Sequence, residues 1–202
     1  MTIGSIILIV LGVMALIGLG SNAIRDFDIP VLGLVLALGA IVGLNFVTPF
    51  RIGNLVFSLG AALLFTMTFF LWLFKGKWST KLMCLLVIAV LAGLTYGATR
   101  LSLYFGNRLW GRVNYYYALI VGFLAFIATR NAKYGFIAGV LSIFVATLLT
   151  QIGTTVSFNE PYSTSIVAGS FAVVLYSFAA RLMPSRPSKL AYYFEVGRMK
   201  DR

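Results

Sequence analysis

Seven apolar stretches follow one another along this chain, with only short polar segments between them. A bilayer-spanning helix needs roughly 20 apolar residues, which is close to the length of most of these stretches. Hydrophobic residues make up 60% of the chain and charged residues 10%, whereas about 25% of a typical soluble domain is charged. The pattern excludes an ordinary soluble domain, a disordered chain and a coiled coil. It predicts an all-α polytopic membrane protein.

The spans that we expect nearly exhaust the sequence and leave no room for a soluble domain. They cover residues 3–20, 30–47, 54–74, 82–98, 114–129, 134–152 and 165–183. Residues 1–183 therefore form one transmembrane helical domain, and residues 184–202 form a basic tail. The N-terminus lacks the positive region of a cleaved signal peptide, so we expect the first stretch to stay as a span.

One region has two interpretations. Residues 99–113 alternate arginines with large apolar side chains. This pattern fits a helix lying in the membrane interface, and it equally fits an extension of the fourth span followed by a loop. Six spans are the alternative to seven if the fourth and fifth are assigned wrongly.

The basic residues predict the orientation. The chain has 16 lysines and arginines against five acids, and cytoplasmic loops of membrane proteins collect lysine and arginine. With seven spans, 12 basic residues fall on the face that carries the tail, and only Arg51, Arg100, Arg108 and Arg112 fall on the other. We therefore expect the N-terminus outside, the C-terminus in the cytoplasm, and a place in a bacterial cytoplasmic membrane. The basic loops and tail would meet anionic lipid head groups rather than nucleic acid.

Three pairs of glycines spaced four residues apart lie in the predicted spans. They are Gly39 with Gly43, Gly93 with Gly97, and Gly135 with Gly139. Residues four apart share one helix face, and two small residues there let another helix approach closely. These faces are candidates for packing within the bundle, or for contact with a membrane partner or a second copy of the chain.

Catalytic chemistry has little support. The chain has no histidine, its single cysteine (Cys84) lies within an apolar run, and all five acids fall in loops or the tail. A serine or cysteine nucleophile normally needs a nearby base, most often histidine. Ion-coupled carriers usually need an ionisable group inside the bilayer. We expect a protein that is not an enzyme, with no catalytic, metal or cofactor residue.

Uncharged polar residues within the spans are the other candidates for contacts. Serine and threonine often bond back to a carbonyl of their own helix. The amides of Asn45 and Gln151 need partners more strongly, although both lie near span ends, where water can solvate them. Glu160 lies in the polar segment 153–164 and is the only acid on the predicted outer face, so we expect an exposed contact loop there.

Two segments carry a resemblance to a known family. Ser58–Phe65 shares glycine, alanine and leucine with an Asn-Val-Gly-Gly-Ala-Leu-Ile-Pro pattern in the third span of that family, and Tyr134–Leu141 is similar to a second family segment. The family is an uncharacterised group of bacterial and archaeal polytopic membrane proteins. The resemblance implies a prokaryotic membrane protein and no particular activity.

Two functional classes follow. The first is a non-catalytic subunit or scaffold that organises a membrane complex through its glycine-rich faces, basic loops and tail. The alternative is a small transport protein, or the substrate-binding membrane subunit of a multi-subunit importer. A binding subunit requires a polar pocket lined by several spans, whereas a scaffold requires an apolar face that a partner covers.

Overall fold

The computed structural model describes residues 2–18, 21–27, 29–74, 78–104, 115–152 and 156–182. Within these ranges the regular structure is helical apart from three short strands. Every described element long enough to matter for crossing a membrane is a helix. The basic tail and residues 105–114 lie outside the described part. The helices are α1 (Ile3–Leu16), α2 (Ser21–Asp26), α3 (Val31–Leu44), α4 (Leu59–Phe74), α5 (Trp78–Tyr104), α6 (Tyr115–Thr129), α7 (Ala132–Thr150) and α8 (Asn159–Leu182).

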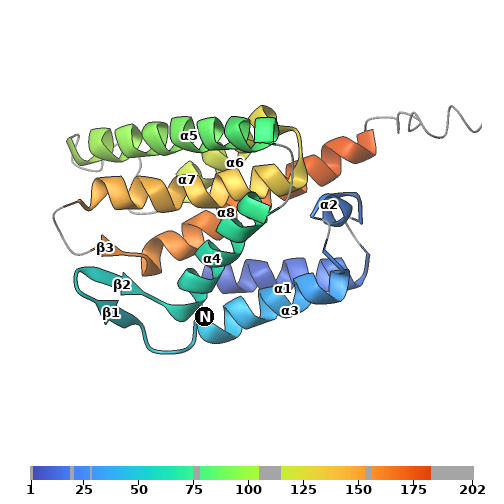
Figure 1. Cartoon of the computed structure of the whole chain (residues 1–202), viewed down its shortest axis with the longest axis horizontal. Helices are drawn as coiled ribbons and strands as arrows, with labels where there is room; N and C mark the ends of the chain where they lie inside the picture. Colours follow the sequence, from blue (N-terminus) through green and yellow to red (C-terminus); the bar gives the residue numbers. More distant parts are fainter. Residues whose placement is uncertain are drawn as a thin grey trace, which may run out of the picture.

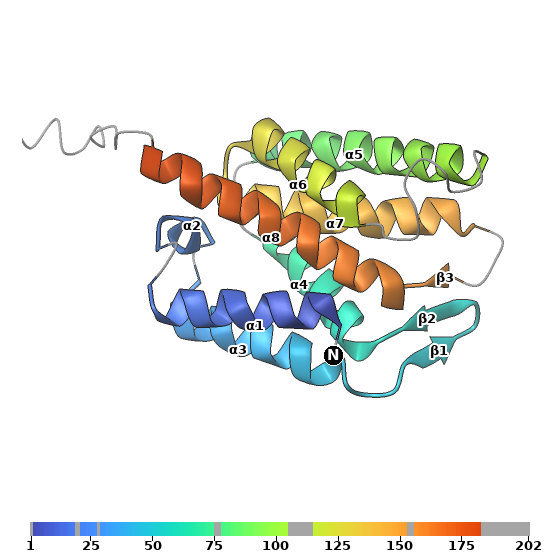
Figure 2. The same cartoon turned by 180° about the vertical axis from the view of Figure 1, so that it is seen from behind.

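Apart from the short α2, successive helices run in alternating directions along one bundle (Figures 1 and 2). The N-terminal end of α1 lies at one end of the bundle, together with the three strands. The C-terminal end of α8 lies at the other end, together with α2. We call these the strand end and the α2 end.

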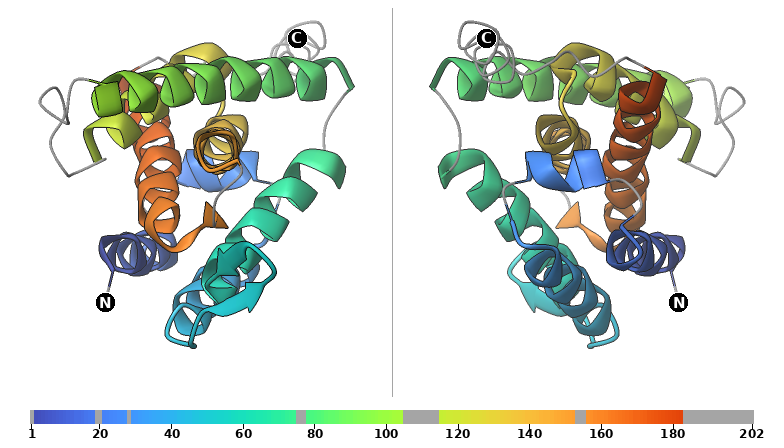
Figure 3. Two further views of the ribbon diagram at one scale, coloured as in Figure 1. Left: turned by 90° about the vertical axis from the view of Figure 1, so that its left-hand side faces the viewer. Right: turned by 90° about the vertical axis from the view of Figure 1, so that its right-hand side faces the viewer.

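Helix α7 is the central element. It contacts α4, α5, α6 and α8, and the end-on views in Figure 3 show it inside the ring formed by its neighbours. Of its 19 residues, 13 are buried. Its start is set locally, because the Asn131 side chain accepts a hydrogen bond from the backbone N–H of Tyr134 at 3.1 Å. This N-cap satisfies one of the free N–H groups that begin every helix.

A small sheet closes the strand end. Strand β1 (Phe50–Ile52) pairs antiparallel with β2 (Leu55–Phe57), and β2 pairs parallel with β3 (Val156–Ser157). Gly53 turns the hairpin with a φ of 58°, a conformation that glycine adopts without steric cost. The rings of Phe57 and Phe158 stack with centroids 4.7 Å apart, which fixes the sheet against the start of α8.

Three helices are long and apolar enough to cross a membrane, through the segments Trp78–Ser102, Ala132–Thr150 and Pro161–Ala180. Four more apolar helices, α1, α3, α4 and α6, have 14 to 16 residues each. At about 1.5 Å per residue these four reach about 21–24 Å, short of the roughly 30 Å hydrocarbon core. The structure therefore supports several membrane-spanning helices, but most are shorter than the apolar runs from which we predicted them.

Several sequence-based boundaries need correction, and one open alternative is decided. The first apolar run is not helical throughout, because α1 ends at Leu16, and the expected loop after it contains the helix α2. The third span begins at Leu59 and not at 54, since residues 55–57 pair as a strand. Residues 99–104 continue α5, which is the extension that we considered. The expected loop 153–164 is wrong from Asn159 onward, where α8 begins, and it contains the strand of residues 156–157.

Candidate functional site

A pocket of about 130 Å³ lies among α5, α6, α7 and α8, toward the strand end. Seven of the ten residues that line it carry a hydroxyl or an amide group, and the others are apolar. None of the described residues that line it is charged. The lining residues are Thr95, Thr99, Tyr117, Ile143, Ala146, Thr147, Thr150, Gln151, Pro161 and Thr164.

Helix spacing brings the hydroxyls together. Thr95 and Thr99 are four residues apart on α5, and Thr147 is three and four residues before Thr150 and Gln151 on α7. Residues three or four apart lie on the same helix face. Because α5 packs on α7, the two polar faces meet. The first turn of α6 adds Tyr117, and the second turn of α8 adds Thr164.

The protons of four of these hydroxyls are already used. Thr95 and Thr99 donate to the carbonyls of Leu91 and Thr95 at 2.7 and 2.8 Å. Thr147 and Thr150 donate to the carbonyls of Ile143 and Ala146 at 2.8 and 2.7 Å. These bonds confirm the expected bonding of serine and threonine back to their own helices. A hydroxyl that has donated its proton still has lone pairs to accept with, so the pocket wall offers acceptors.

Two further polar side chains tie the pocket to its surroundings. The Tyr117 hydroxyl donates to the Ala98 carbonyl at 3.4 Å, which joins α6 to α5. The Gln151 side-chain oxygen accepts from the backbone N–H of Ser157 at 2.7 Å. Gln151 thus has a protein partner instead of depending on water alone, and it holds β3 beside the end of α7.

The other two candidate polar contacts lie away from this pocket. Asn45 follows α3 directly, and its amide donates to the Ser5 hydroxyl of α1 at 3.4 Å, beside a bond of 2.9 Å between the Ser5 and Thr2 hydroxyls. Glu160 lies in the first turn of α8 and not in a loop, and its side chain is outside the described part of the structure.

The three glycine pairs have different surroundings. A Cβ atom on Gly139 would lie 3.0 Å from the backbone nitrogen of Gly169, and one on Gly135 would lie 3.4 Å from the Ala172 side chain, so this pair faces α8. A Cβ atom on Gly39, Gly43, Gly93 or Gly97 would meet nothing within 4 Å. Those two pairs therefore face outward from α3 and α5.

Glycines outside the repeated spacing make closer helix contacts. A Cβ atom on Gly122 would lie 2.4 Å from the Ala168 carbonyl oxygen, and one on Gly60 would lie 2.6 Å from the Ile41 carbonyl oxygen. These positions are where α6 approaches α8 and where α4 approaches α3. Neither glycine belongs to a pair spaced four residues apart, so that spacing does not predict these two contacts.

Two lysines that we expected in loops are buried in the first turns of helices. Lys81 is 8% exposed and donates to the Leu73 carbonyl, which ties α5 to α4. Lys133 is 3% exposed, and its ammonium lies 5.4 Å from the centre of the Tyr134 ring. Both side chains sit at the α2 end of the bundle, where the topology predicts the basic face.

Among the described residues, no three histidine, cysteine or acidic side chains gather closely enough to hold a metal ion. Comparison with known proteins adds no constraint: no family model, no curated protein and no solved structure matches this chain.

Proposed function

We propose that this chain is a membrane transport protein, or the solute-binding membrane subunit of a transporter, and that the pocket among α5, α6, α7 and α8 binds a small uncharged polar solute. The pocket is the observation that supports this proposal most directly, because four helices contribute polar side chains to a common cavity. Threonine is common where membrane helices pack, but here five threonines, Tyr117 and Gln151 surround one open space.

The chemistry of the pocket wall limits the kinds of solute that can bind. Four hydroxyls present lone pairs and no free proton, so a solute rich in hydrogen-bond donors fits best. No described lining residue carries a charge that could neutralise an ion. A volume of about 130 Å³ corresponds to roughly four water molecules at about 30 Å³ each in the liquid. Small polyols and amides such as glycerol and urea are in this range.

We further propose seven spans, namely α1 and α3–α8, in a bacterial cytoplasmic membrane, with the N-terminus outside and the C-terminus in the cytoplasm. Charge supports this orientation, because Arg25, Lys81, Arg130 and Lys133 lie toward the α2 end. A direct contact supports the alternation: Asp26 accepts a hydrogen bond from the backbone N–H of Ala132 at 3.3 Å, so the segments after α1 and after α6 meet at one end. The pocket, which lies toward the strand end, is then nearer the outer face of the membrane.

The test is uptake of radiolabelled glycerol and urea into proteoliposomes that contain the purified chain. We expect faster uptake than in protein-free liposomes, and slower uptake with Thr147→Val, which removes one pocket hydroxyl at nearly constant shape. Thr66→Val is the matched control, because Thr66 makes the same bond to its own helix, at 2.8 Å to the Ala62 carbonyl, outside the pocket. Uptake at the protein-free rate would contradict a carrier that works alone, and equal loss in both variants would contradict the role of the pocket.

A second candidate is a non-catalytic scaffold in a membrane complex. The outward glycine pairs on α3 and α5 favour it, since they leave two flat faces that no part of the described chain covers. A mild-detergent pull-down of the tagged chain from native membranes, read by mass spectrometry, separates the two. Stoichiometric recovery of an ATPase and a second membrane subunit supports an importer, whereas another set of partners supports a scaffold.

A further inference from the structure

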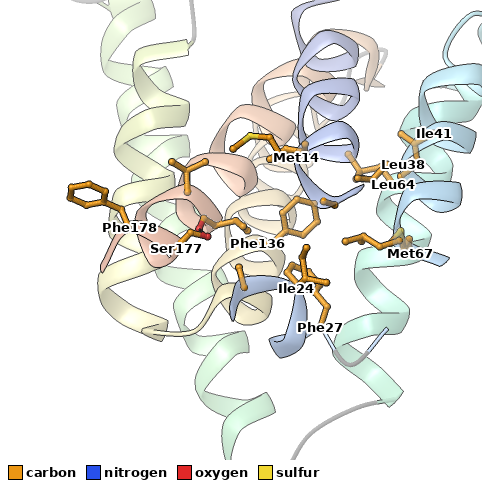
Figure 4. A pocket seen from close by; sticks show the side chains of 16 residues that line it. Met14, Ile24, Phe27, Leu38, Ile41, Leu64, Met67, Phe136, Ser177 and Phe178 are labelled. Carbon is orange, nitrogen blue, oxygen red and sulfur yellow. Dashed lines mark hydrogen bonds between the residues drawn. The ribbon is translucent and has the colours of Figure 1, made fainter. Parts of the chain in front are cut away.

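A second cavity, of about 230 Å³, lies at the other end of the bundle, where α1 and α3 meet α4, α7 and α8 beside α2 (Figure 4). Its wall is almost entirely carbon. The one hydroxyl in the lining belongs to Ser177, and its proton is donated to the Val173 carbonyl at 2.9 Å. An engineered apolar cavity of about 150 Å³ stays dry and binds benzene, so a larger one of this character accepts hydrocarbon and not a polar solute.

The cavity reaches the outer surface of the bundle. Three lining residues are partly exposed: Met14 on α1 at 38%, and Val174 and Phe178 on α8 at 47% and 63%. Deeper in the cavity the lining is closed, since Ile41 and Leu64 are fully buried. The cavity is therefore a recess with a side opening between α1 and α8, at the level of apolar helices that would be surrounded by lipid tails.

The helix α2 joins this recess to a basic corner. Ala23, Ile24 and Phe27 line the recess, and the neighbouring Arg25 is exposed. Asp26 contacts the start of α7 through the Ala132 N–H, 3.3 Å away, and this brings the connection between α6 and α7 to the same corner. That connection carries Arg130, which is exposed, and the buried Lys133 follows in the first turn of α7.

Positive charge exceeds negative charge among the described residues of this corner. Asp26 is the only acid that the structure describes at this corner, and its carboxylate accepts from the Ala132 N–H and interacts with the Tyr176 hydroxyl. Carboxylates are stabilised in this way at a helix N-terminus. The two exposed arginines have no such acid facing them within the described part of the chain. A basic pocket between membrane helices on the cytoplasmic side is the usual setting for an anionic lipid head group.

We propose that this recess is a binding site for an anionic phospholipid, whose acyl chain fills the cavity and whose phosphate lies against Arg25. The apolar wall of the recess binds the acyl chain of the lipid, and the basic corner favours a negatively charged head group. The site lies at the opposite end of the bundle from the polar pocket, so it can fail or hold separately from the proposed transport function.

Native mass spectrometry of the full chain tests this site. The protein is purified in mild detergent and supplied with equal amounts of phosphatidylglycerol and phosphatidylcholine of identical acyl chains. We expect one retained phosphatidylglycerol. Arg25→Gln should lower its preference over phosphatidylcholine by about fivefold, the factor that corresponds to about 1 kcal/mol per basic residue near an anionic surface. Arg100→Gln is the control, because Arg100 is exposed on α5 toward the strand end and bonds to the Tyr96 hydroxyl.

A second pair of variants tests whether the apolar recess holds the acyl chain of the lipid. Val174→Trp fills the mouth of the recess from a partly exposed position, and Val90→Trp adds the same bulk to α5, where Val90 is 52% exposed and outside the recess. We expect Val174→Trp to release the lipid and Val90→Trp to keep it. Equal retention of both lipids, an unchanged preference in Arg25→Gln, or retention in Val174→Trp equal to the wild type would overturn the proposal. So would a wild-type chain that keeps no lipid, as expected if part of the chain itself fills the recess.

Discussion

The contact between α6 and α8 at Gly122 predicts a strong effect of a single methyl group. A Cβ atom at this position would lie 2.4 Å from the Ala168 carbonyl oxygen, and 3.2 Å from the Phe171 Cβ. Ordinary contact begins at 3.4 Å, so the two helices must separate by about 1 Å to accept Gly122→Ala, because close-packed backbones cannot yield as side chains do.

In Gly122→Ala the cost of overpacking opposes the gain in helix propensity, and the contacts at Gly122 indicate which of the two is larger. Overpacking costs about 1–3 kcal/mol, and alanine gains about 1 kcal/mol over glycine in helix propensity. Since the obstacle at Gly122 is a backbone oxygen, we place the cost at the upper end and expect a net loss of about 1–2 kcal/mol. The same substitution at Gly93, where a Cβ atom meets nothing within 4 Å, keeps only the gain.

The chain carries its own reporter for the measurement. Cys84 is the only cysteine in the sequence and is 2% exposed, so a fluorogenic maleimide reacts as the bundle unfolds. At about 2–4 °C per kcal/mol for a chain of this size, Gly122→Ala should lower the Tm by about 2–8 °C. Gly93→Ala should leave the Tm unchanged or raise it. Equal Tm values for the two variants would refute the reasoning from helix approach.

Three further predictions concern stability in the same assay. Tyr162→Phe should change the Tm little, because the Tyr162 side chain is fully buried and its hydroxyl, although near the Ser5 hydroxyl, makes no well-formed hydrogen bond among the described residues; a clear loss of Tm would show that the Tyr162 hydroxyl is bonded to Ser5. Asn131→Ala should cost about 1 kcal/mol by removing the N-cap of α7, and an unchanged Tm would speak against that cap. Arg130→Gly should raise the Tm, since Arg130 has a φ of 48° and a non-glycine residue pays about 1 kcal/mol there; a drop would mean that its side chain matters more than its backbone.

Hydropathy alone was sufficient to predict an all-α chain with several apolar helices, and insufficient to predict where those helices begin and end. Apolar runs predict where helices lie because the bilayer requires closed backbone hydrogen bonding, which a helix supplies. The same runs cannot say that Leu55–Phe57 forms a strand, since its partners lie at Phe50–Ile52 and Val156–Ser157. Pairing between distant segments leaves no trace in local hydropathy.

Only part of the polar pocket could be predicted from the sequence. Thr147, Thr150 and Gln151 share one helix face by spacing alone, as do Thr95 and Thr99. That these two faces meet depends on α5 packing against α7, which no local pattern encodes. The glycine pairs show the same limit, because Gly135 and Gly139 face α8 while the four others face outward.

Labelling from the two sides of the membrane tests the central claim, a bundle of alternating spans with the strand end outside. In a Cys84→Ala background, Arg51→Cys reports the exposed hairpin at the strand end, and Arg130→Cys reports the exposed turn between α6 and α7. With a membrane-impermeant maleimide on intact cells, we expect Arg51→Cys to react at once and Arg130→Cys to react only after the membrane is opened. Reaction of both from the same side would contradict the alternating topology, and the reverse order would contradict the proposed orientation.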